Sequence, residues 1–325
     1  MIIYQVAVLI LLCLGLIYST SLIITSIKNL AVKSHLGAYG ITAFILAIST
    51  SLPELIVSIV ASIEGNTSLV LGNIIGSNIA DLSLVIGAAA VLGGSLQVTG
   101  TILSRDIYLT GSAGFLPIFL IADGTLSRPD GVVLLVIYLV MIATFLRTHH
   151  RSLAVHALSR SPMQRLLATI TSSHGKGSLL KFMFGIGLLL TSSHFIVQLS
   201  TSLAQSSGLS ALFIGLFIVS IGTSLPELAF EIKAVLGGQA KMALGDLLGS
   251  VVANSTLILG LAAIIRPLTL THRGLLPYGL AIGAFTLMYF AFILFIKTKK
   301  KLEWWEGLFL ISGYAIFAIL EFSRA

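Results

Sequence analysis

Long apolar runs recur from one end of this sequence to the other, and they limit the folds that the chain can adopt. Ten runs approach the ~20 residues that a helix needs to cross a bilayer. They lie at about 3–27, 39–63, 69–94, 107–122, 131–146, 179–204, 210–236, 242–265, 274–296 and 303–322. Of the 325 residues, 56% are hydrophobic and 10% are charged, too few charges to coat a soluble globule. The sequence therefore predicts an all-α integral membrane protein with ten transmembrane helices, and it excludes a cytosolic enzyme.

The remaining composition restricts the chemistry of the chain. The single cysteine, Cys13, excludes an internal disulfide and a cysteine-based metal site. The seven histidines form no HExxH motif, and the chain has no GxxxxGK[ST] loop for ATP. We attribute the net charge of +7 to basic loops beside membrane helices rather than to a nucleic-acid surface. We expect no cofactor, no nucleic acid and no ATP, with the lipid bilayer as a partner; a monomer is compatible with this organisation.

The distribution of Lys and Arg predicts the orientation. With ten spans, 15 of the 19 basic residues fall on one side and four, Arg128, Arg266, Arg273 and Arg324, on the other. Since cytoplasmic loops are enriched in Lys and Arg, both termini should be extracytoplasmic, and the cell membrane is the expected location. The first run carries no basic residue before it, so we expect a retained helix and not a signal peptide. Within the loop 147–178, the stretch 151–165 suits either an amphipathic helix on anionic lipid or a solvated basic loop.

One internal repeat organises the chain. The segment Ile41–Gly87 aligns without a gap on Ile214–Gly260 at a constant offset of 173, and the sequence Thr-Ser-Leu-Pro-Glu-Leu occurs in both copies. This divides the chain into a first five-helix half (1–146), a basic cytoplasmic loop (147–178) and a second five-helix half (179–325). Because five is odd, the two copies should lie antiparallel in the membrane, as an inverted-topology repeat. Transporters commonly have this architecture, and a channel could also be built in this way.

The repeated motif places a proline and an acid within a membrane helix. Pro53 and Pro226 lack the N–H of a helical residue, so each helix should kink and release carbonyl groups. The released groups could instead be satisfied by neighbouring Ser and Thr hydroxyls. Glu54 and Glu227 follow these prolines, and a charge at the bilayer centre costs ~2.5–3.5 kcal/mol. Such acids are retained mainly where they bind something. We favour a mobile cation over structural pairing with a base.

The next helix of each copy carries a line of polar residues. Asn73, Ser77 and Asp81 in the first copy recur as Asp246, Ser250 and Asn254 in the second, each trio spaced i, i+4, i+8 along one helix face. Two Gly-xxx-Gly pairs, beginning at Gly72 and Gly245, provide small surfaces for close helix packing. The polar face could then be pressed against the kinked helix.

Together the two copies offer only hard oxygen ligands, which suit Ca²⁺ and Na⁺. Besides the released carbonyl groups, the candidate ligands are Glu54, Glu227, Asp81, Asn254, Thr50, Ser51, Ser77, Thr223, Ser224 and Ser250.

The paired Thr-Ser-Leu-Pro-Glu and Gly-x-x-x-Gly-Ser helices resemble the α-repeats of the cation/Ca²⁺ exchanger superfamily, and most closely its prokaryotic Na⁺/Ca²⁺ exchanger branch. The resemblance implies a ten-helix antiporter with ion sites between the second, third, seventh and eighth helices, and alternating access through sliding of the first and sixth. It also implies main-chain ligands at Ala47 and Ser220. The chain departs from the usual pattern, since Asp81 is the acid and Asn254 the amide, and Asp246 and Glu231 are additional acids.

The leading hypothesis is a secondary antiporter that exchanges Na⁺ for Ca²⁺, with both ions as substrates. H⁺/Ca²⁺ exchange is the first alternative, with Asp81, Asp246 and Glu231 as proton carriers. A cation channel is the alternative from another class. An intramembrane enzyme is the weakest of the four.

Overall fold

The computed structural model describes residues 2–33, 50–97, 101–149, 173–270, 274–299 and 301–324. The predicted ligand Ala47 and the stretch 151–165 lie outside these residues. Most described residues are helical, and the helices of eight or more residues are α1 (Ile2–Lys33), α3 (Leu52–Glu64), α4 (Thr67–Ala80), α5 (Ile86–Gly93), α6 (Thr101–Leu120), α7 (Arg128–His149), α9 (Ser173–Ser207), α12 (Leu225–Leu236), α13 (Ala240–Val252), α15 (Gly279–Lys299) and α16 (Trp304–Phe322).

Shorter helical segments and strands connect or extend these helices. The short α-helices are α10 (Ala211–Ile214), α11 (Ser220–Thr223) and α14 (Leu259–Ile265). In the described part of the chain, three segments are π-helical: η1 (Asp81–Val85), η4 (Gly215–Val219) and η5 (Ala253–Ile258). The 3-10 turns are η2 (Ile121–Asp123) and η6 (Leu276–Tyr278), and the strands are β1 (Ser95–Gln97), β2 (Thr125–Leu126), β3 (Leu268–Thr269) and β4 (Lys301–Glu303).

The described helices are those of an integral membrane protein. Within the described ranges, seven helices are long and apolar enough to cross a membrane, or up to eight if a bent pair, 211–223 with 225–236, forms one span. Large apolar side chains such as Leu139, Phe184 and Leu294 are exposed on the outside of the bundle. Exposure of this kind fits contact with lipid, where apolar surface is not penalised.

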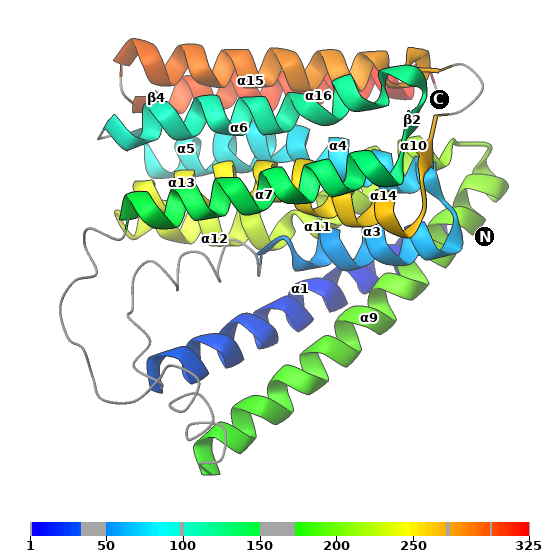
Figure 1. The fold of residues 1–325 in the computed structure, drawn as a ribbon, viewed down its shortest axis with the longest axis horizontal. Coiled ribbons are helices and arrows are strands. Elements are labelled where there is room, and N and C mark those ends of the chain that lie inside the picture. The colour runs from blue at the N-terminus through cyan, green and yellow to red at the C-terminus, as the bar shows by residue number, and fades with distance from the viewer. Residues whose placement is uncertain are drawn as a thin grey trace.

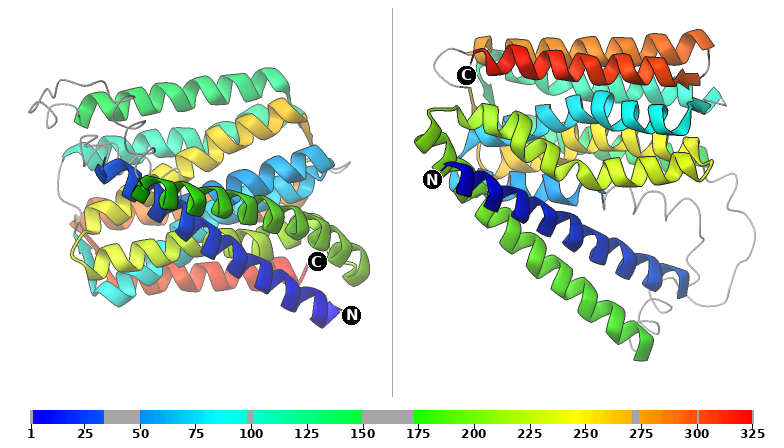
Figure 2. Two further views of the ribbon diagram at one scale, coloured as in Figure 1. Left: turned by 90° about the horizontal axis from the view of Figure 1, so that it is seen from below. Right: turned by 180° about the vertical axis from the view of Figure 1, so that it is seen from behind.

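Helices α1 and α9 form a pair that is inclined to the rest of the bundle, as Figure 1 and the right-hand view of Figure 2 show. The two helices pack along each other, and small residues allow the approach. A Cβ on Gly15 would lie 3.0 Å from Ser192 Oγ, and one on Gly185 would lie 2.9 Å from Ile23 Cγ1. The pair contacts the remaining helices mainly through α3 and α11.

Among the described residues, two short antiparallel ribbons link the halves of the chain. β1 pairs with β4, with Leu96 opposite Leu302, and β2 pairs with β3, with Leu126 opposite Leu268. The offset of 173 relates the start of β1 to the start of β3. Figure 1 shows β4 and β2 at opposite ends of the helical bundle. Each ribbon therefore ties the end of one repeat copy to the other half.

The Gly-xxx-Gly pair of α4 allows close contact with the second half, as predicted. A Cβ on Gly72 would lie 2.5 Å from the carbonyl oxygen of Leu212, and one on Gly76 would lie 2.5 Å from that of Leu216. The backbones of α4 and η4 can approach this closely only because both positions lack a side chain. At Gly245 no described atom lies within 4 Å of the Cβ position. The segment equivalent to α10 and η4 in the first half falls within 34–49, outside the described residues.

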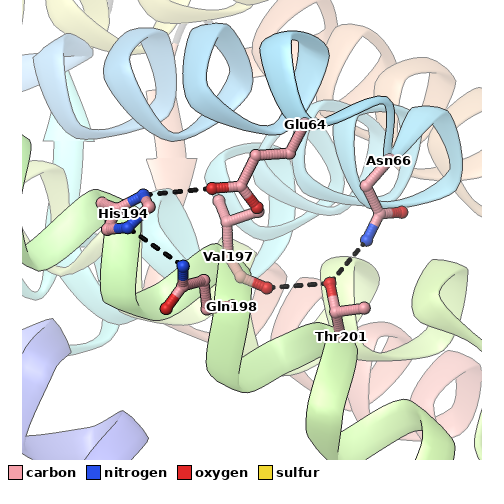
Figure 3. Close-up of polar contacts among 6 residues, drawn as sticks. All are labelled: Glu64, Asn66, His194, Val197, Gln198 and Thr201. Carbon is pink, nitrogen blue, oxygen red and sulfur yellow. Dashed lines mark hydrogen bonds and ion pairs between the residues drawn. The ribbon is translucent and has the colours of Figure 1, made fainter.

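Polar side chains join the C-terminal end of α3 to α9 (Figure 3). His194 Nδ1 lies 3.0 Å from Glu64 Oε1, and the other ring nitrogen lies 3.0 Å from Gln198 Nε2. Asn66 Nδ2 donates a hydrogen bond to Thr201 Oγ1 at 3.0 Å. These contacts are partly exposed, so they contribute little to stability.

Candidate cation site

The site begins at two helix breaks that are equivalent in the repeat. α3 starts after Ser51 and α12 after Ser224, and each has proline at its second residue, where a missing N–H has no cost. The backbone angles of the two caps agree closely, with φ −81° and ψ 10° at Ser51 and φ −84° and ψ 3° at Ser224. The helix axis bends by 42° between 211–223 and 225–236. The predicted kink is confirmed at Pro226.

The carbonyl group of Ser220 is less open than predicted. Its oxygen accepts hydrogen bonds from the backbone N–H of Ser224 at 2.9 Å and from Thr223 Oγ1 at 3.1 Å. The helix therefore continues as far as Ser224, and a neighbouring hydroxyl satisfies the same oxygen, as the alternative reading of the kink anticipated. A cation at this oxygen would have to share it with these donors or displace them.

Glu54 and Glu227, the two acids of the repeated motif, are buried and lie near each other. Their exposed fractions are 1% and 2%. The Ser224 hydroxyl donates to Glu54 Oε1 at 3.3 Å, and the hydroxyls of Ser77 and Thr223 also adjoin this carboxylate. The carboxyl group of Glu227 interacts electrostatically with that of Glu54. Residues far apart in the chain thus lie in one buried region of the bundle.

Threonine hydroxyl groups form hydrogen bonds between the two halves near these acids. Thr50 Oγ1 donates to Asp246 Oδ1 at 3.2 Å, and the equivalent Thr223 Oγ1 donates to Asn73 Oδ1 at 3.3 Å. Each threonine therefore reaches the polar helix of the opposite half.

A second pair of crossing contacts involves serines. Ser51 Oγ donates to Ser250 Oγ at 3.3 Å, and Ser77 Oγ lies 3.5 Å from Thr223 Oγ1. The structure accordingly brings Ser51, Ser77 and Ser250 to the same buried region as the acids.

Asp81 and Asn254, the acid and amide at the end of each polar line, open the π-helical part of their helices. Asp81 is the first residue of η1, and Asn254 is the second residue of η5. The carboxyl group of Asp81 interacts electrostatically with Glu54 and lies next to the Ser224 hydroxyl. Asn254 Nδ2 donates instead to Asn78 Oδ1 at 3.1 Å. Asp81 thus joins the cluster directly, whereas the amide nitrogen of Asn254 is held by a neighbouring amide.

The predicted ligand set omits several buried polar residues of this region. Asn78 bonds both Asn254 and Ser255, the latter at 2.9 Å. Its repeat counterpart is Val251, so comparing the two copies gives no reason to select it. Asp246 and Glu231, expected only as possible proton carriers, are 4% and 1% exposed. In the sequence, Asn78, Asp246 and Glu231 could have been selected only because each is an amide or an acid inside an apolar run.

Several buried carboxyl and amide oxygens have no hydrogen-bond partner in the described part of the chain. In the predicted ligand set they are Glu54 Oε2, Asp81 Oδ1, Glu227 Oε2 and Asn254 Oδ1. No described Lys or Arg forms an ion pair with these acids. A buried anion of this kind requires a positive partner.

Carboxylates alone would not hold a cation in this region. Among the described residues, no group of three or more His, Cys, Asp and Glu side chains could hold a metal ion. A cation here would therefore take its ligands from one or two carboxylates together with hydroxyl, amide and carbonyl oxygens. Calcium sites use such mixed oxygen sets.

Comparison with known families gives a match that is consistent with a cation site made of oxygen ligands. The family model described as sodium/calcium exchanger protein matches residues 4–147 and 177–322, most of the chain. The chain belongs to the sodium/calcium exchanger family. The family is one of membrane transporters, and its model covers both repeat copies. The resemblance stated from the sequence is thereby confirmed.

Curated relatives of the family align over much or nearly all of the chain. The sodium/calcium exchanger MaX1 of Methanosarcina acetivorans is 27% identical over 347 residues, covering 96% of this chain and 97% of the relative. The inner membrane protein YrbG of Escherichia coli is 34% identical over 229 residues, covering 69% and 68%.

Solved structures share the fold at lower identity. The sodium-calcium exchanger NCX_Mj aligns with a TM-score of 0.64 at 24% identity, covering 97% of this chain and 98% of that one. The H⁺/Ca²⁺ exchanger CAX aligns with a TM-score of 0.73 at 17% identity, covering 99% and 87%. Since both identities are low, these matches establish the fold and leave the coupling ion open between Na⁺ and H⁺.

Proposed function

We propose that this protein is a secondary antiporter that exchanges Na⁺ for Ca²⁺ across a membrane by alternating access. The observation that carries the proposal is the meeting of Glu54 and Glu227, one acid from each half, in a buried region without a basic partner in the described chain. The Ser224 hydroxyl, which donates to Glu54, joins the two half-sites. A metal cation is the partner that would balance these charges.

Exchange follows from competition for these ligands. One Ca²⁺ neutralises two carboxylates, and Na⁺ ions can replace it at the same oxygens because both are hard cations. In the empty site, ionised acids have no counter-charge in a dry interior, and this costs free energy. The cost disfavours the step in which the site changes its open side without a bound cation. The downhill movement of one ion then drives the other without ATP. We propose as ligands the predicted residues, with Glu54 and Glu227 central and Asp81 at the flank.

The proposed moving part is the pair α1 and α9. They contain the first and sixth of the ten predicted spans, they pack along each other, and they are inclined to the rest of the bundle (Figure 1). Their sliding over α3 and α11 would open the site to one side of the membrane or the other. The polar contacts between α3 and α9 in Figure 3 would then differ between the two states.

The proposed topology has ten spans in two inverted halves, 1–146 and 179–325. Both termini are extracytoplasmic, the loop 147–178 is cytoplasmic, and the cell membrane is the location. The equivalent ribbons at opposite ends of the bundle support an inverted relation between the halves. Single accessible cysteines placed at the two termini and in the loop, in a Cys13→Ser protein, test the topology through labelling from outside the cell.

Transport in proteoliposomes tests the function. Purified protein is reconstituted, vesicles are loaded with Na⁺ and diluted into Na⁺-free buffer, and uptake of radiolabelled Ca²⁺ is followed at fixed pH with a protonophore present. We expect Ca²⁺ to accumulate against its own gradient, and no accumulation when the vesicles hold choline. Purely downhill Ca²⁺ flux would identify a channel and overturn the proposal.

H⁺/Ca²⁺ exchange is the second candidate, and the additional buried acids Glu231 and Asp246 favour it. Under this alternative, Ca²⁺ uptake would require a pH gradient, be abolished by the protonophore and be indifferent to Na⁺. The same vesicles therefore decide between the two coupling ions.

A further inference from the structure

A second pair of acids lies in the second half, beside the candidate site but outside its predicted ligand set. Glu231 lies on α12, one turn beyond Glu227, and Asp246 lies on α13. Both are buried, with exposed fractions of 1% and 4%. The two helices pack against each other. The function proposed above assigns no metal ligand here.

The repeat shows that these two positions are neighbours. The offset of 173 relates Glu231 to Ser58 and Asp246 to Asn73. In the first half, Asn73 Nδ2 donates to Ser58 Oγ at 3.2 Å, so a hydrogen bond joins the two positions directly. In the second half, the carboxyl groups of Glu231 and Asp246 interact electrostatically. The first half thus has a neutral, hydrogen-bonded pair, Ser58 and Asn73. The second half has two acids, Glu231 and Asp246, at the equivalent positions.

The two acids are incompletely satisfied by the described residues. Asp246 Oδ1 accepts a hydrogen bond from Thr50, whereas Asp246 Oδ2 and Glu231 Oε2 are buried without a partner in that part of the chain. Two ionised carboxylates side by side in a dry interior repel each other and lose their hydration. Keeping both carboxylates ionised requires a positive charge close by.

No described basic residue supplies this charge. Neither Glu231 nor Asp246 forms an ion pair within the described ranges. Lys233, two residues further along α12, is exposed. A cation bound by Glu54 and Glu227 would be balanced by those acids and Asp81, and would leave the second pair without compensation.

We propose that Glu231 and Asp246, together with the Thr50 hydroxyl, bind a further metal cation of the hard, oxygen-seeking class next to the central site. The proposal rests on the antiporter function, which supplies Ca²⁺ and Na⁺ to this interior. Two carboxylates carry the charge that one Ca²⁺ balances, and hydroxyl oxygens are among its usual ligands. The additional site exists in only one half, so the two halves of the transporter differ in the number of cations that they hold.

Equilibrium binding of radiolabelled Ca²⁺ to purified protein, at fixed pH and without Na⁺, tests the site. The Glu54→Gln variant removes a central acid, so the binding that remains reports the second pair. We expect this variant to keep a Ca²⁺ site. Adding Glu231→Ser and Asp246→Asn, which copies the neutral pair of the first half, should weaken the remaining binding about tenfold or more, because ligand charge sets the affinity. Lys233→Gln, on the exposed face of the same helix, should leave it unchanged.

Isosteric replacements guard against misfolding. The variant with Glu231→Ser and Asp246→Asn could misfold and then not elute as a single species in size-exclusion chromatography. In that case, Glu231→Gln with Asp246→Asn preserves the packing and should weaken Ca²⁺ binding to the same extent. The proposal is overturned if Glu54→Gln retains no Ca²⁺ binding, or if the retained binding does not respond to either replacement of the pair.

The outcome is independent of the function test. If wild-type vesicles show no exchange but the second pair still binds Ca²⁺, the antiporter function is wrong and the site stands. If the vesicles exchange Na⁺ for Ca²⁺ but the pair variants bind as their parent does, only this inference fails.

Discussion

The hydroxyl of Ser224 donates a hydrogen bond at 3.3 Å to the carboxylate of Glu54, which precedes it by 170 residues in the chain. Ser224 caps α12, and Glu54 lies in the first turn of α3, so the contact joins the two helix breaks. Neither half contains both partners. The candidate site therefore exists only when the two repeat copies are packed together, and changes that separate the copies should affect cation binding.

Asp81→Asn should alter the coupling to Na⁺ more than the binding of Ca²⁺. Asp81 is buried, and its carboxyl group interacts electrostatically with Glu54 and Asp246. The amide keeps the shape and removes one negative charge that balances bound cations. We expect Ca²⁺ binding to persist and the half-saturating Na⁺ concentration of exchange to rise, by about tenfold for a loss of ~1.4 kcal/mol. Ca²⁺ uptake measured against Na⁺ concentration at fixed pH checks this, and superimposable curves for the two proteins would contradict it.

Gly76→Ala should destabilise the contact between the halves. A Cβ at this position would lie 2.5 Å from the Leu216 carbonyl oxygen and 2.8 Å from Leu216 Cα. Both are backbone atoms, so α4 and η4 would have to move apart. Overpacking of this kind costs about 1–3 kcal/mol. A lower midpoint of thermal unfolding in detergent is the expected result.

The matched control for this change is Gly283→Ala on α15. No described atom lies within 4 Å of a Cβ at Gly283, and the residue is exposed. Alanine also favours a helix over glycine by up to ~1 kcal/mol. We expect an unchanged or slightly higher midpoint. Equal destabilisation by the two alanines would show that the contact between α4 and η4 is not as close as described.

A disulfide between α1 and α9 should form and should leave exchange intact. A Cβ on Gly15 would lie 3.9 Å from Ser192 Cβ, a separation at which disulfides form readily. Gly15→Cys with Ser192→Cys, in a Cys13→Ser protein, would lock the two helices together. Because we propose that they move as one unit, oxidised and reduced proteoliposomes should transport Ca²⁺ at similar rates. Loss of transport on oxidation, with recovery on reduction, would show that the two helices must move relative to each other.

The sequence predicts the elements of the site because the repeat is exact over the motif that matters. Thr-Ser-Leu-Pro-Glu-Leu in both copies identifies the acids, the prolines and the hydroxyls, and the structure brings the described members of this set together. The polar face of α4 is predictable for the same reason. A helical spacing of four fixes which side of the continuous helix α4–η1 carries Asn73, Ser77 and Asp81.

Contacts across the halves could not be predicted in this way. Sequence spacing says which residues share a face, but not which face of the other copy they meet, so the pairing of Thr50 with Asp246 emerges only in the folded protein. Asn78 is missed because its counterpart is Val251, although it bonds Asn254. The π-helical segments η1 and η5 add a residue to a helical turn within a run that reads as regular helix. The Ser220 carbonyl oxygen, which the resemblance implies as a ligand, accepts a hydrogen bond from the Thr223 hydroxyl of its own turn.

The most direct test of the central claim is Na⁺-driven Ca²⁺ uptake by proteoliposomes containing Glu54→Gln or Glu227→Gln, compared with wild type at equal amounts of folded protein. Glutamine preserves the shape of each side chain and removes its charge. The account predicts that either single replacement abolishes accumulation, since one carboxylate from each half is required to balance the cation. Accumulation at the wild-type rate by either folded variant would contradict the shared site.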